Sequence, residues 1–291
     1  MNYDSSWQAL LDPGRSSDWF VDFDKISSFE HGSSYQPNIA WLCCEVSRLC
    51  YFDHQRDPQN FESILRRAPL SLVNTVHTDG LLCHLFVVNT PSAHPFTLLA
   101  FRGTAQPENW LFNLNIRTAT WCTAAKVHEG FLSAFEKLWG KISFHFSELP
   151  SPCYLTGHSL GGALATLAAG RHKPDGAYTF GAPKVGNTEF ARQIETCTAI
   201  FRVVNHCDVV TTLPWESPVC RFEHAGECHY LNSEGERVPS PPSYTITENP
   251  LQSPPNWRAL FSKPSIIGQP IKALSDHSPI NYLRALANEI N

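Results

Sequence analysis

Residues 153–163 read Cys-Tyr-Leu-Thr-Gly-His-Ser-Leu-Gly-Gly-Ala, and this stretch decides the fold class. An apolar strand runs into a Gly-x-Ser-x-Gly pattern, and an alanine-rich helix follows over 163–169. This order is typical of a sharp strand-to-helix turn that presents a serine hydroxyl at a helix N-terminus. Free backbone N–H groups there favour a developing negative charge. Ser159 is therefore the predicted nucleophile, whereas His158 is expected to be an elbow or packing residue whose side chain points away from it.

Short apolar segments alternate with helical patterns along the rest of the chain. This alternation predicts an α/β fold with a mostly parallel central sheet flanked by helices. The expected strands cover 81–88, Phe96–Phe101, 153–156, 178–180 and 200–204, with a hairpin over 230–238. The expected helices cover 37–51, 61–67, 129–146, 160–171, 188–196 and 279–289. We expect one domain over 1–291, with an irregular segment over 1–35 and a proline-rich surface loop over 239–270.

A serine nucleophile needs a histidine base, and a carboxylate must orient that base. In this architecture the acid and then the histidine follow the serine, each on a loop after a later strand. Asp208 follows the strand over 200–204 and is the predicted acid. Asp175 is the alternative, but it precedes its strand and is therefore expected at the opposite edge of the sheet.

The chain contains 13 histidines, so the order along the chain has to select the base. His277 lies just before the last predicted helix and is the predicted base, because a loop at that point can return over the nucleophile. His224 and His229 also follow the acid and are the alternatives, although His229 begins the predicted hairpin. Asp276 is not expected to orient its neighbour, because adjacent side chains on a loop diverge.

The tetrahedral intermediate needs two donors for its oxyanion. The predicted donors are the backbone N–H of Leu160, directly after the nucleophile, and Thr104, on the loop after the strand Phe96–Phe101. The next segment, 105–120, is a candidate lid that opens onto lipid, the alternative being that it packs permanently on the core. Its large apolar side chains are the candidate lid and substrate contacts Trp110, Leu111, Phe112 and Leu114.

The charge and hydropathy patterns exclude several classes of partner. The net charge is −5 and no basic run is present, so no nucleic-acid partner is expected. No stretch approaches 18 apolar residues, so no transmembrane segment is expected. The first residues lack the pattern of a secretory signal, which predicts a cytoplasmic or otherwise soluble, non-exported protein. Another export route, or a mature form already processed, is the alternative.

The ten cysteines contain no Cys-x-x-Cys pair and match no metal-ligand spacing. Several lie in apolar runs, so we expect reduced, buried thiols and no metal. A single disulfide, for example between Cys220 and Cys228, is the alternative.

These motifs together resemble the class 3 lipases, the fungal-type triacylglycerol lipase family. The resemblance runs in order over about residues 75–285, most of the chain, through Phe101-Arg-Gly-Thr104, Asn109-Trp110, Val127-His-Glu-Gly-Phe131, residues 156–162, residues 179–186, residues 204–209 and Asp276-His277. It implies an α/β-hydrolase fold with a lid after Thr104. It also implies a triad of Ser159, Asp208 and His277, with Thr104 and Leu160 as the oxyanion hole.

The expected function is that of a serine carboxylic ester hydrolase acting on acylglycerol-type lipids at a lipid–water interface, as a triacylglycerol lipase does. It would act through an acyl-enzyme on Ser159 with no metal or organic cofactor. The sequence does not specify the oligomeric state, and a monomer is favoured. A phospholipase A1 and a feruloyl or short-chain esterase are the alternatives within the same chemistry. An inactive α/β-hydrolase scaffold that only binds lipid or a partner is the alternative from a different class.

Overall fold

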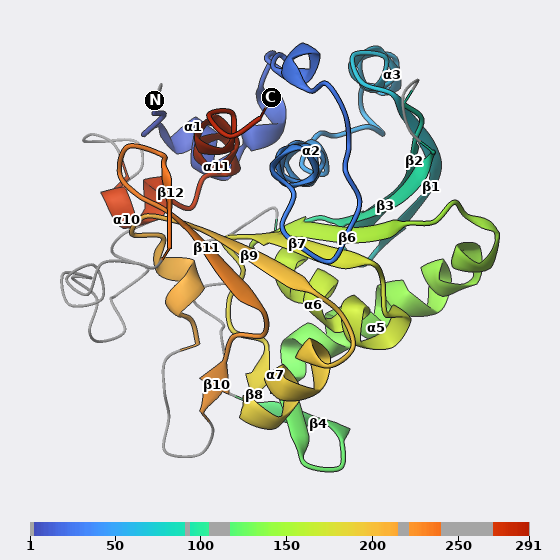
Figure 1. Cartoon of the computed structure of the whole chain (residues 1–291), viewed down its shortest axis with the longest axis vertical. Helices are drawn as coiled ribbons and strands as arrows, with labels where there is room; N and C mark the ends of the chain where they lie inside the picture. Colours follow the sequence, from blue (N-terminus) through green and yellow to red (C-terminus); the bar gives the residue numbers. More distant parts are fainter. Residues whose placement is uncertain (1–2, 91–93, 105–116, 215–220, 240–269, 291) are drawn as a thin grey trace.

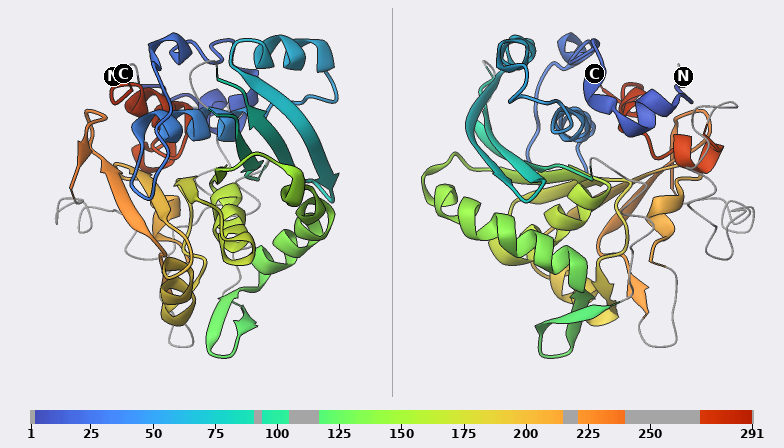
Figure 2. Two further views of the ribbon diagram at one scale, coloured as in Figure 1. Left: turned by 45° about the vertical axis from the view of Figure 1, so that its right-hand side comes forward. Right: turned by 180° about the vertical axis from the view of Figure 1, so that it is seen from behind.

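The computed structural model describes residues 3–90, 94–104, 117–214, 221–239 and 270–290. Helices cover both faces of a twisted central sheet, as Figures 1 and 2 show, so the predicted α/β architecture is confirmed. Within the described residues, the sheet has eight strands in the order β1-β2-β3-β6-β7-β9-β11-β12. Their bounds are Leu70–Thr78, Leu81–Val88, Phe96–Phe101, Cys153–His158, Gly176–Phe180, Ile200–Asn205, Glu227–Leu231 and Arg237–Val238. The strands from β3 to β11 pair in parallel, and the pairs at both ends of the sheet are antiparallel.

Alternating side chains of the parallel strands enter two separate hydrophobic clusters. In β6, Tyr154 belongs to one cluster and Leu155 to the other, and in β3 Leu98 and Leu99 divide in the same way. Successive strand residues point to opposite faces, so a strand covered on both faces is apolar throughout. This explains why β3 and β6 read as continuous apolar runs.

The two faces of the sheet carry different helices (Figure 1). Helices α2 (Pro37–Leu49) and α11 (Pro279–Leu286) cover one face, and α5 (Glu129–Ile142), α6 (Leu160–His172) and α7 (Thr188–Glu195) cover the other. The first ten residues of α6 are buried, which accounts for its alanine-rich, all-round apolar sequence. Further helical elements among the described residues are α3 (Pro58–Leu65), α10 (Lys272–Ser275) and the 3-10 turns η3 (Ser143–Glu148) and η4 (Val209–Thr212).

A small second sheet projects beyond α5 and α7 (Figure 2). Its strands, in the order β10-β8-β5-β4 among the described residues, are Phe222–Glu223, Gly186–Asn187, Ala125–His128 and Thr118–Cys122. Residues 118–120, which fall in the expected lid range, lie in β4. Residues 105–116 of that range, including Trp110, Leu111, Phe112 and Leu114, lie outside the described residues, as does 240–269 of the proline-rich loop.

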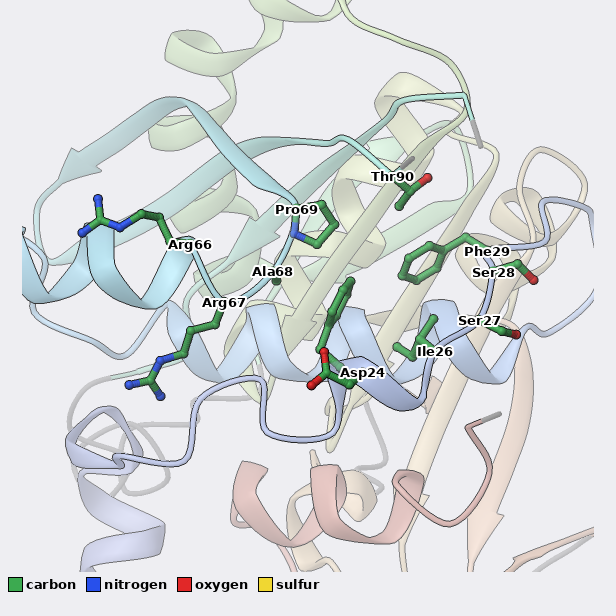
Figure 3. A pocket seen from close by; sticks show the side chains of 11 residues that line it. Asp24, Ile26, Ser27, Ser28, Phe29, Arg66, Arg67, Ala68, Pro69 and Thr90 are labelled. Atoms are coloured by element: carbon green, nitrogen blue, oxygen red, sulfur yellow. The ribbon is translucent and has the colours of Figure 1, made fainter. Parts of the chain in front are cut away.

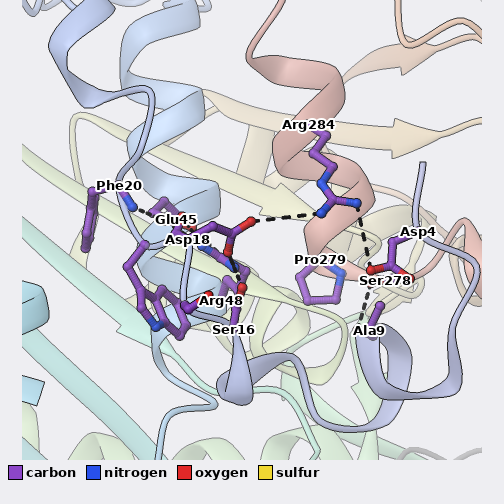
Figure 4. Close-up of polar contacts among 12 residues, drawn as sticks. Asp4, Ala9, Ser16, Asp18, Phe20, Glu45, Arg48, Ser278, Pro279 and Arg284 are labelled. Carbon is purple, nitrogen blue, oxygen red and sulfur yellow. Dashed lines mark hydrogen bonds and ion pairs between the residues drawn. The ribbon is translucent and has the colours of Figure 1, made fainter. Parts of the chain in front are cut away.

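The N-terminal segment, expected to be irregular, contains the short helix α1 (Trp7–Leu11) and the 3-10 turns η1 (Pro13–Arg15) and η2 (Phe23–Lys25). Buried polar contacts fix it to α2 and α11 (Figure 4). Arg48 and Glu45, both fully buried on α2, pair at 2.7 Å, and Glu45 also accepts from the backbone N–H of Phe20 at 2.6 Å. Arg48 pairs with Asp18 at 2.8 Å, and Ser278 donates to the carbonyl of Ala9 at 2.7 Å.

The described cysteines carry free thiols. Cys228 is one of them, and Cys220, its suggested disulfide partner, lies outside the described residues. Burial raises the pKa of the Cys83 and Cys153 thiols to about 12, so both are protonated at neutral pH. These two cysteines therefore act as small apolar core residues.

Candidate active site

Ser159 lies at the turn between β6 and α6, with φ of 59° and ψ of −127°. This backbone conformation is strained for a residue with a Cβ, so surrounding contacts must hold it in place. One such contact is the hydrogen bond that its N–H donates to the carbonyl of Phe180, at the end of β7, over 2.9 Å. The strained strand-to-helix turn that the sequence pattern predicts is therefore present at this residue.

Two glycines around Ser159 allow the strand and the helix to approach each other. A Cβ at Gly157 would lie 2.2 Å from the carbonyl carbon of Gly161, and a Cβ at Gly161 would lie 2.1 Å from the backbone oxygen of Phe101. Neither position accepts a side chain without a backbone shift. The second contact also brings the loop after β3, which contains Thr104, against the first turn of α6.

Asp208 follows β9 and is almost completely buried. Its Oδ1 accepts from the N–H of Val210 at 2.9 Å, which caps η4. Its Oδ2 accepts from the hydroxyl of Tyr282 at 2.6 Å and lies 2.9 Å from Nδ1 of His277. These donors supply the compensation that a buried carboxylate requires, and they hold the carboxylate in one orientation.

His277 lies between α10 and α11, and it is also buried. Because the Asp208 carboxylate accepts, Nδ1 of His277 carries the proton in this contact. The neutral ring then has an unprotonated Nε2, which is the state that a general base requires. The structure thus brings His277 and Asp208 into direct contact, although 69 residues separate them along the chain.

Gly181 shows how closely the acid, the base and the serine turn approach one another. A Cβ at Gly181 would lie 2.6 Å from Oδ2 of Asp208 and 2.9 Å from Nδ1 of His277. The preceding residue, Phe180, accepts from the N–H of Ser159. The rings of His158 and His277 lie 4.5 Å apart, centroid to centroid. The serine turn and the acid and base loops therefore meet at the carboxyl ends of β6, β7 and β9.

The predicted oxyanion donors lie at the same edge of the sheet. Leu160 is the first residue of α6, where backbone N–H groups have no acceptor within the helix. Thr104 follows β3, whose last residue, Phe101, pairs with Gly157 of β6. Both residues are therefore positioned at the carboxyl end of the central strands, close to the serine turn.

The alternative acids lie in different surroundings. Oδ2 of Asp175 accepts from the N–H of Cys153 at 2.7 Å, at the first residue of β6 and thus at the opposite edge of the sheet. Asp276 directs its carboxylate to Tyr3 at 2.7 Å and to Lys272 and His206 at 3.1 Å. Neither carboxylate is a partner of His277.

The alternative bases are engaged elsewhere as well. Nε2 of His224 lies 2.7 Å from the carbonyl of Thr211, and the ring of His229, on β11, stacks on Tyr35 at 3.9 Å. Burial lowers the pKa of His224 well below its usual range and that of His229 to about 4. Both rings are therefore neutral structural groups.

One set of potential metal ligands lies beside this site, formed by His206, Cys207 and Asp276 within 4.8 Å of one another. His206 and Cys207 directly precede the acid Asp208, and Asp276 directly precedes the base His277. The Asp276 carboxylate already accepts from the ammonium of Lys272 and the hydroxyl of Tyr3. The same carboxylate accepts from the N–H of Cys207 at 3.1 Å and lies 3.1 Å from Nδ1 of His206, so it links the acid and base loops. The expected lack of a metal requirement stays a prediction.

Figure 3 shows a surface pocket of about 530 Å³ between the N-terminal segment and the start of β1. Phe29 and Pro69 line it, together with Arg67, whose guanidinium donates to the carbonyl of Ser17 at 3.1 Å. It opens near the amino end of β3, because Phe29 packs on Phe96. This places the pocket at the opposite edge of the sheet from the serine turn.

Two residues of the site had no predicted role. Tyr282 contacts Asp208 from α11, and Tyr51 lies 2.9 Å from Nδ1 of His158. A tyrosine in a terminal helix and another after an early helix carry no local motif. Only the position of Tyr282, five residues after the predicted base, was a signal that could have drawn attention to it.

Comparisons with known proteins are consistent with this fold. A family model described as Lipase (class 3) matches residues 98–217. "Secreted mono- and diacylglycerol lipase 1" of Fusarium solani is 34% identical over 173 residues, 55% of this chain and 50% of that protein. A lipase of Rhizomucor miehei is 33% identical over 150 residues, 46% of this chain and 41% of that protein. The chain therefore spans half or less of the length of these two relatives.

A solved structure, the native propeptide complex of Rhizomucor miehei lipase, matches with a TM-score of 0.58. The match covers 80% of this chain and 83% of that chain at 22% identity, which shows a common fold. The sheet order and the strained serine turn define an α/β-hydrolase fold. Residues 98–217 of the chain match the class 3 lipase family model, in agreement with the resemblance that the motifs show.

The expected cellular location is wrong. The sequence pattern favoured a cytoplasmic, non-exported protein, but the Fusarium solani relative is a secreted lipase, which points to secretion. The reasoning failed because it relied on the first residues alone, and these do not determine where such an enzyme acts. None of the described helices has the length and apolar character needed to cross a bilayer.

Proposed function

We propose that this chain is a serine carboxylic ester hydrolase that acts on acylglycerol-type lipids through an acyl-enzyme on Ser159. The observation that carries the proposal is the 2.9 Å contact between Nδ1 of His277 and Oδ2 of Asp208, directly beside the serine turn. This contact leaves Nε2 of His277 as the acceptor for a hydroxyl proton.

In the proposed mechanism, Nε2 of His277 takes the proton of Ser159 while Oγ attacks the ester carbonyl carbon. The N–H of Leu160 and the Thr104 loop stabilise the oxyanion that forms. The C–O bond to the alcohol breaks, and His277 returns its proton to the leaving alcohol. Water then attacks the acyl-enzyme with His277 again as the base, which releases the acid and restores Ser159. Asp208 stabilises the imidazolium in both halves.

The names of relatives support acylglycerols as the substrate class. The Fusarium solani protein is named a mono- and diacylglycerol lipase, and a Nicotiana tabacum protein, 39% identical over 94 residues, is named a triacylglycerol lipase. A phospholipase A1 is the second candidate, because the chloroplastic phospholipase A(1) DAD1 of Arabidopsis thaliana is 30% identical over 151 residues.

A substrate panel tests the proposal. Monoacylglycerol, diacylglycerol and triacylglycerol emulsions, phosphatidylcholine vesicles and p-nitrophenyl esters are offered to the wild-type chain and to Ser159→Ala. We expect acylglycerol hydrolysis to exceed phospholipid hydrolysis and to disappear in the variant. Preferential cleavage of phosphatidylcholine would favour the phospholipase A1. No hydrolysis of any ester by the folded wild-type chain would contradict the proposal.

A further inference from the structure

A line of hydrogen bonds reaches the base from behind the serine turn. The hydroxyl of Tyr51 lies 2.9 Å from Nδ1 of His158, and Nε2 of His158 lies 2.7 Å from the backbone carbonyl oxygen of His277. His158 is the last residue of β6 and is almost completely buried. It immediately precedes Ser159, so this line connects the nucleophile turn to the loop of the base.

The chemistry of the two contacts defines the protonation state of His158. A carbonyl oxygen only accepts, so Nε2 of His158 must carry the hydrogen that His277 receives. Burial lowers the pKa of His158 well below its usual range, so the ring is neutral and its Nδ1 has a lone pair. The hydroxyl of Tyr51 is therefore the donor to Nδ1, and burial raises the pKa of that hydroxyl, which keeps it protonated.

The far end of the line touches the loop that carries the predicted oxyanion donor. A Cβ at Gly103 would lie 2.0 Å from the hydroxyl oxygen of Tyr51 and 2.7 Å from the carbonyl oxygen of His158. Gly103 directly precedes Thr104. Tyr51 and His158 thus link three segments: the oxyanion loop, the nucleophile turn and the base loop.

His277 is consequently held at two points. Asp208 holds its ring through Nδ1, and His158 holds its main chain through the carbonyl oxygen. The hydrogen bond to the ring alone would let the side-chain torsions and the main chain shift together. The second contact also fixes the main chain from which the side chain extends. Catalysis is sensitive to this position, because a displacement of about 1 Å can cost roughly 100-fold in rate.

We propose that Tyr51 and His158 are positioning residues for the ester hydrolysis proposed above, and that they act by fixing the main chain of His277 relative to Ser159. Neither touches the reacting atoms. The neutral ring of His158 adds a second benefit, because it lies 4.5 Å from the ring of His277 and does not repel the imidazolium that forms there during turnover.

Four variants separate positioning from simple packing. Tyr51→Phe removes one hydroxyl and keeps the ring. His158→Leu keeps the bulk and removes the donor, whereas His158→Gln restores an N–H at the end of the side chain. Tyr154→Phe is the matched control, because the hydroxyl of Tyr154 also pairs with a histidine, His31, at 3.1 Å, but at the amino end of β6.

We expect Tyr51→Phe to lower kcat by roughly fivefold and His158→Leu by roughly 100-fold, with KM changed less than about twofold in both. His158→Gln should recover at least about tenfold of the His158→Leu loss, and Tyr154→Phe should leave kcat within about twofold. A kcat within twofold of wild type in Tyr51→Phe and His158→Leu, both correctly folded, would overturn the proposal. A kcat in His158→Gln that is no higher than the kcat in His158→Leu would also overturn it.

A second readout does not depend on activity. In the wild-type chain, nitrogen NMR of the histidine rings should show His158 with its hydrogen on Nε2 and a bare Nδ1 from pH 5 to pH 9. A hydrogen on Nδ1, or a charged ring in this range, would overturn the proposed hydrogen-bond line even if the enzyme is fully active. The expected NMR state could also be found in a chain that hydrolyses no ester. In that case the hydrogen-bond line is present, but the proposed function fails and the positioning role fails with it.

Discussion

Tyr282 donates a 2.6 Å hydrogen bond to Oδ2 of Asp208, the same carboxylate oxygen that accepts from Nδ1 of His277. The tyrosine comes from α11, the helix that begins two residues after His277. The helix that follows the base therefore also holds the acid. Tyr282 thereby connects the acid to the helix that follows the base, and this helix packs against α2.

The first prediction concerns this shared oxygen. Tyr282→Phe keeps the ring but leaves Asp208 with one donor fewer in a buried site. A hydrogen bond to a charged group contributes about 1.5–3 kcal/mol, so we expect a loss of this order in the free energy of unfolding. Because the carboxylate gains freedom to rotate, kcat/KM should fall roughly tenfold. Urea unfolding and ester hydrolysis measure the two effects, and an unchanged kcat/KM would show that Tyr282 does not orient the acid.

The second prediction concerns Gly181, where φ is 59°. In Gly181→Ala, the new methyl group would lie within 3.0 Å of both Asp208 and His277, so the contact between them has to open. We expect kcat/KM to fall by at least about 100-fold.

Gly80→Ala is the control for backbone strain, because its φ is 75° but a Cβ there meets nothing within 4 Å. Both variants should lose about 1–3 kcal/mol of unfolding free energy through strain. Only Gly181→Ala should lose activity. Equal activity in the two variants would mean that the space beside the acid and base does not matter.

The third prediction uses the buried ion pair that fixes the N-terminal segment. Glu45→Gln removes the charge facing Arg48, which is fully buried, and should cost about 3 kcal/mol of unfolding free energy. Asp12→Asn removes an exposed partner of Arg15 at the same 2.7 Å distance and should cost less than about 1 kcal/mol. Chemical denaturation compares them, and similar losses would contradict the role assigned to burial.

The fourth prediction concerns stability in acid. Burial lowers the pKa of His84 from 6.5 to about 3, so the unfolded chain binds a proton there that the folded chain does not. The free energy of unfolding is therefore unaffected by His84 above pH 6.5, and it decreases as the pH falls from 6.5 toward 3. Between about pH 5.5 and pH 4 the loss is about 1.4 kcal/mol per pH unit.

His84→Asn removes this titrating group while retaining a polar atom for the hydroxyl of Thr75, 2.8 Å from Nδ1. The slope of unfolding free energy against pH should become shallower by about 1.4 kcal/mol per unit in the same range. Identical slopes for the variant and the wild type would show that His84 is not a buried neutral group.

The sequence predicted those features that depend on neighbouring residues or on the order of residues along the chain. The serine turn follows from glycines within five residues of one another, and the parallel strands follow from apolar runs. The order of acid and base along the chain selected Asp208 and His277, and the structure places these two in contact.

Features that depend on distant segments were not predictable. Strand β1 was not predicted, because it is an edge strand whose side chains are mostly exposed or half-buried and because it lacks a long apolar run. The second sheet was not predicted because β8 and β10 have only two residues each. The contacts of Tyr51 and Tyr282 join residues 107 and 74 positions apart, and no local pattern specifies such pairs.

The most direct test of the account is covalent labelling by a fluorophosphonate, followed by peptide mass spectrometry. We expect one stoichiometric adduct, located on Ser159 of the folded wild-type chain, and its loss in Ser159→Ala. We also expect labelling at least about 100-fold slower in His277→Gln, because the hydroxyl then lacks its base. An adduct on another residue, or labelling that is equally fast without His277, would contradict the proposed chemistry.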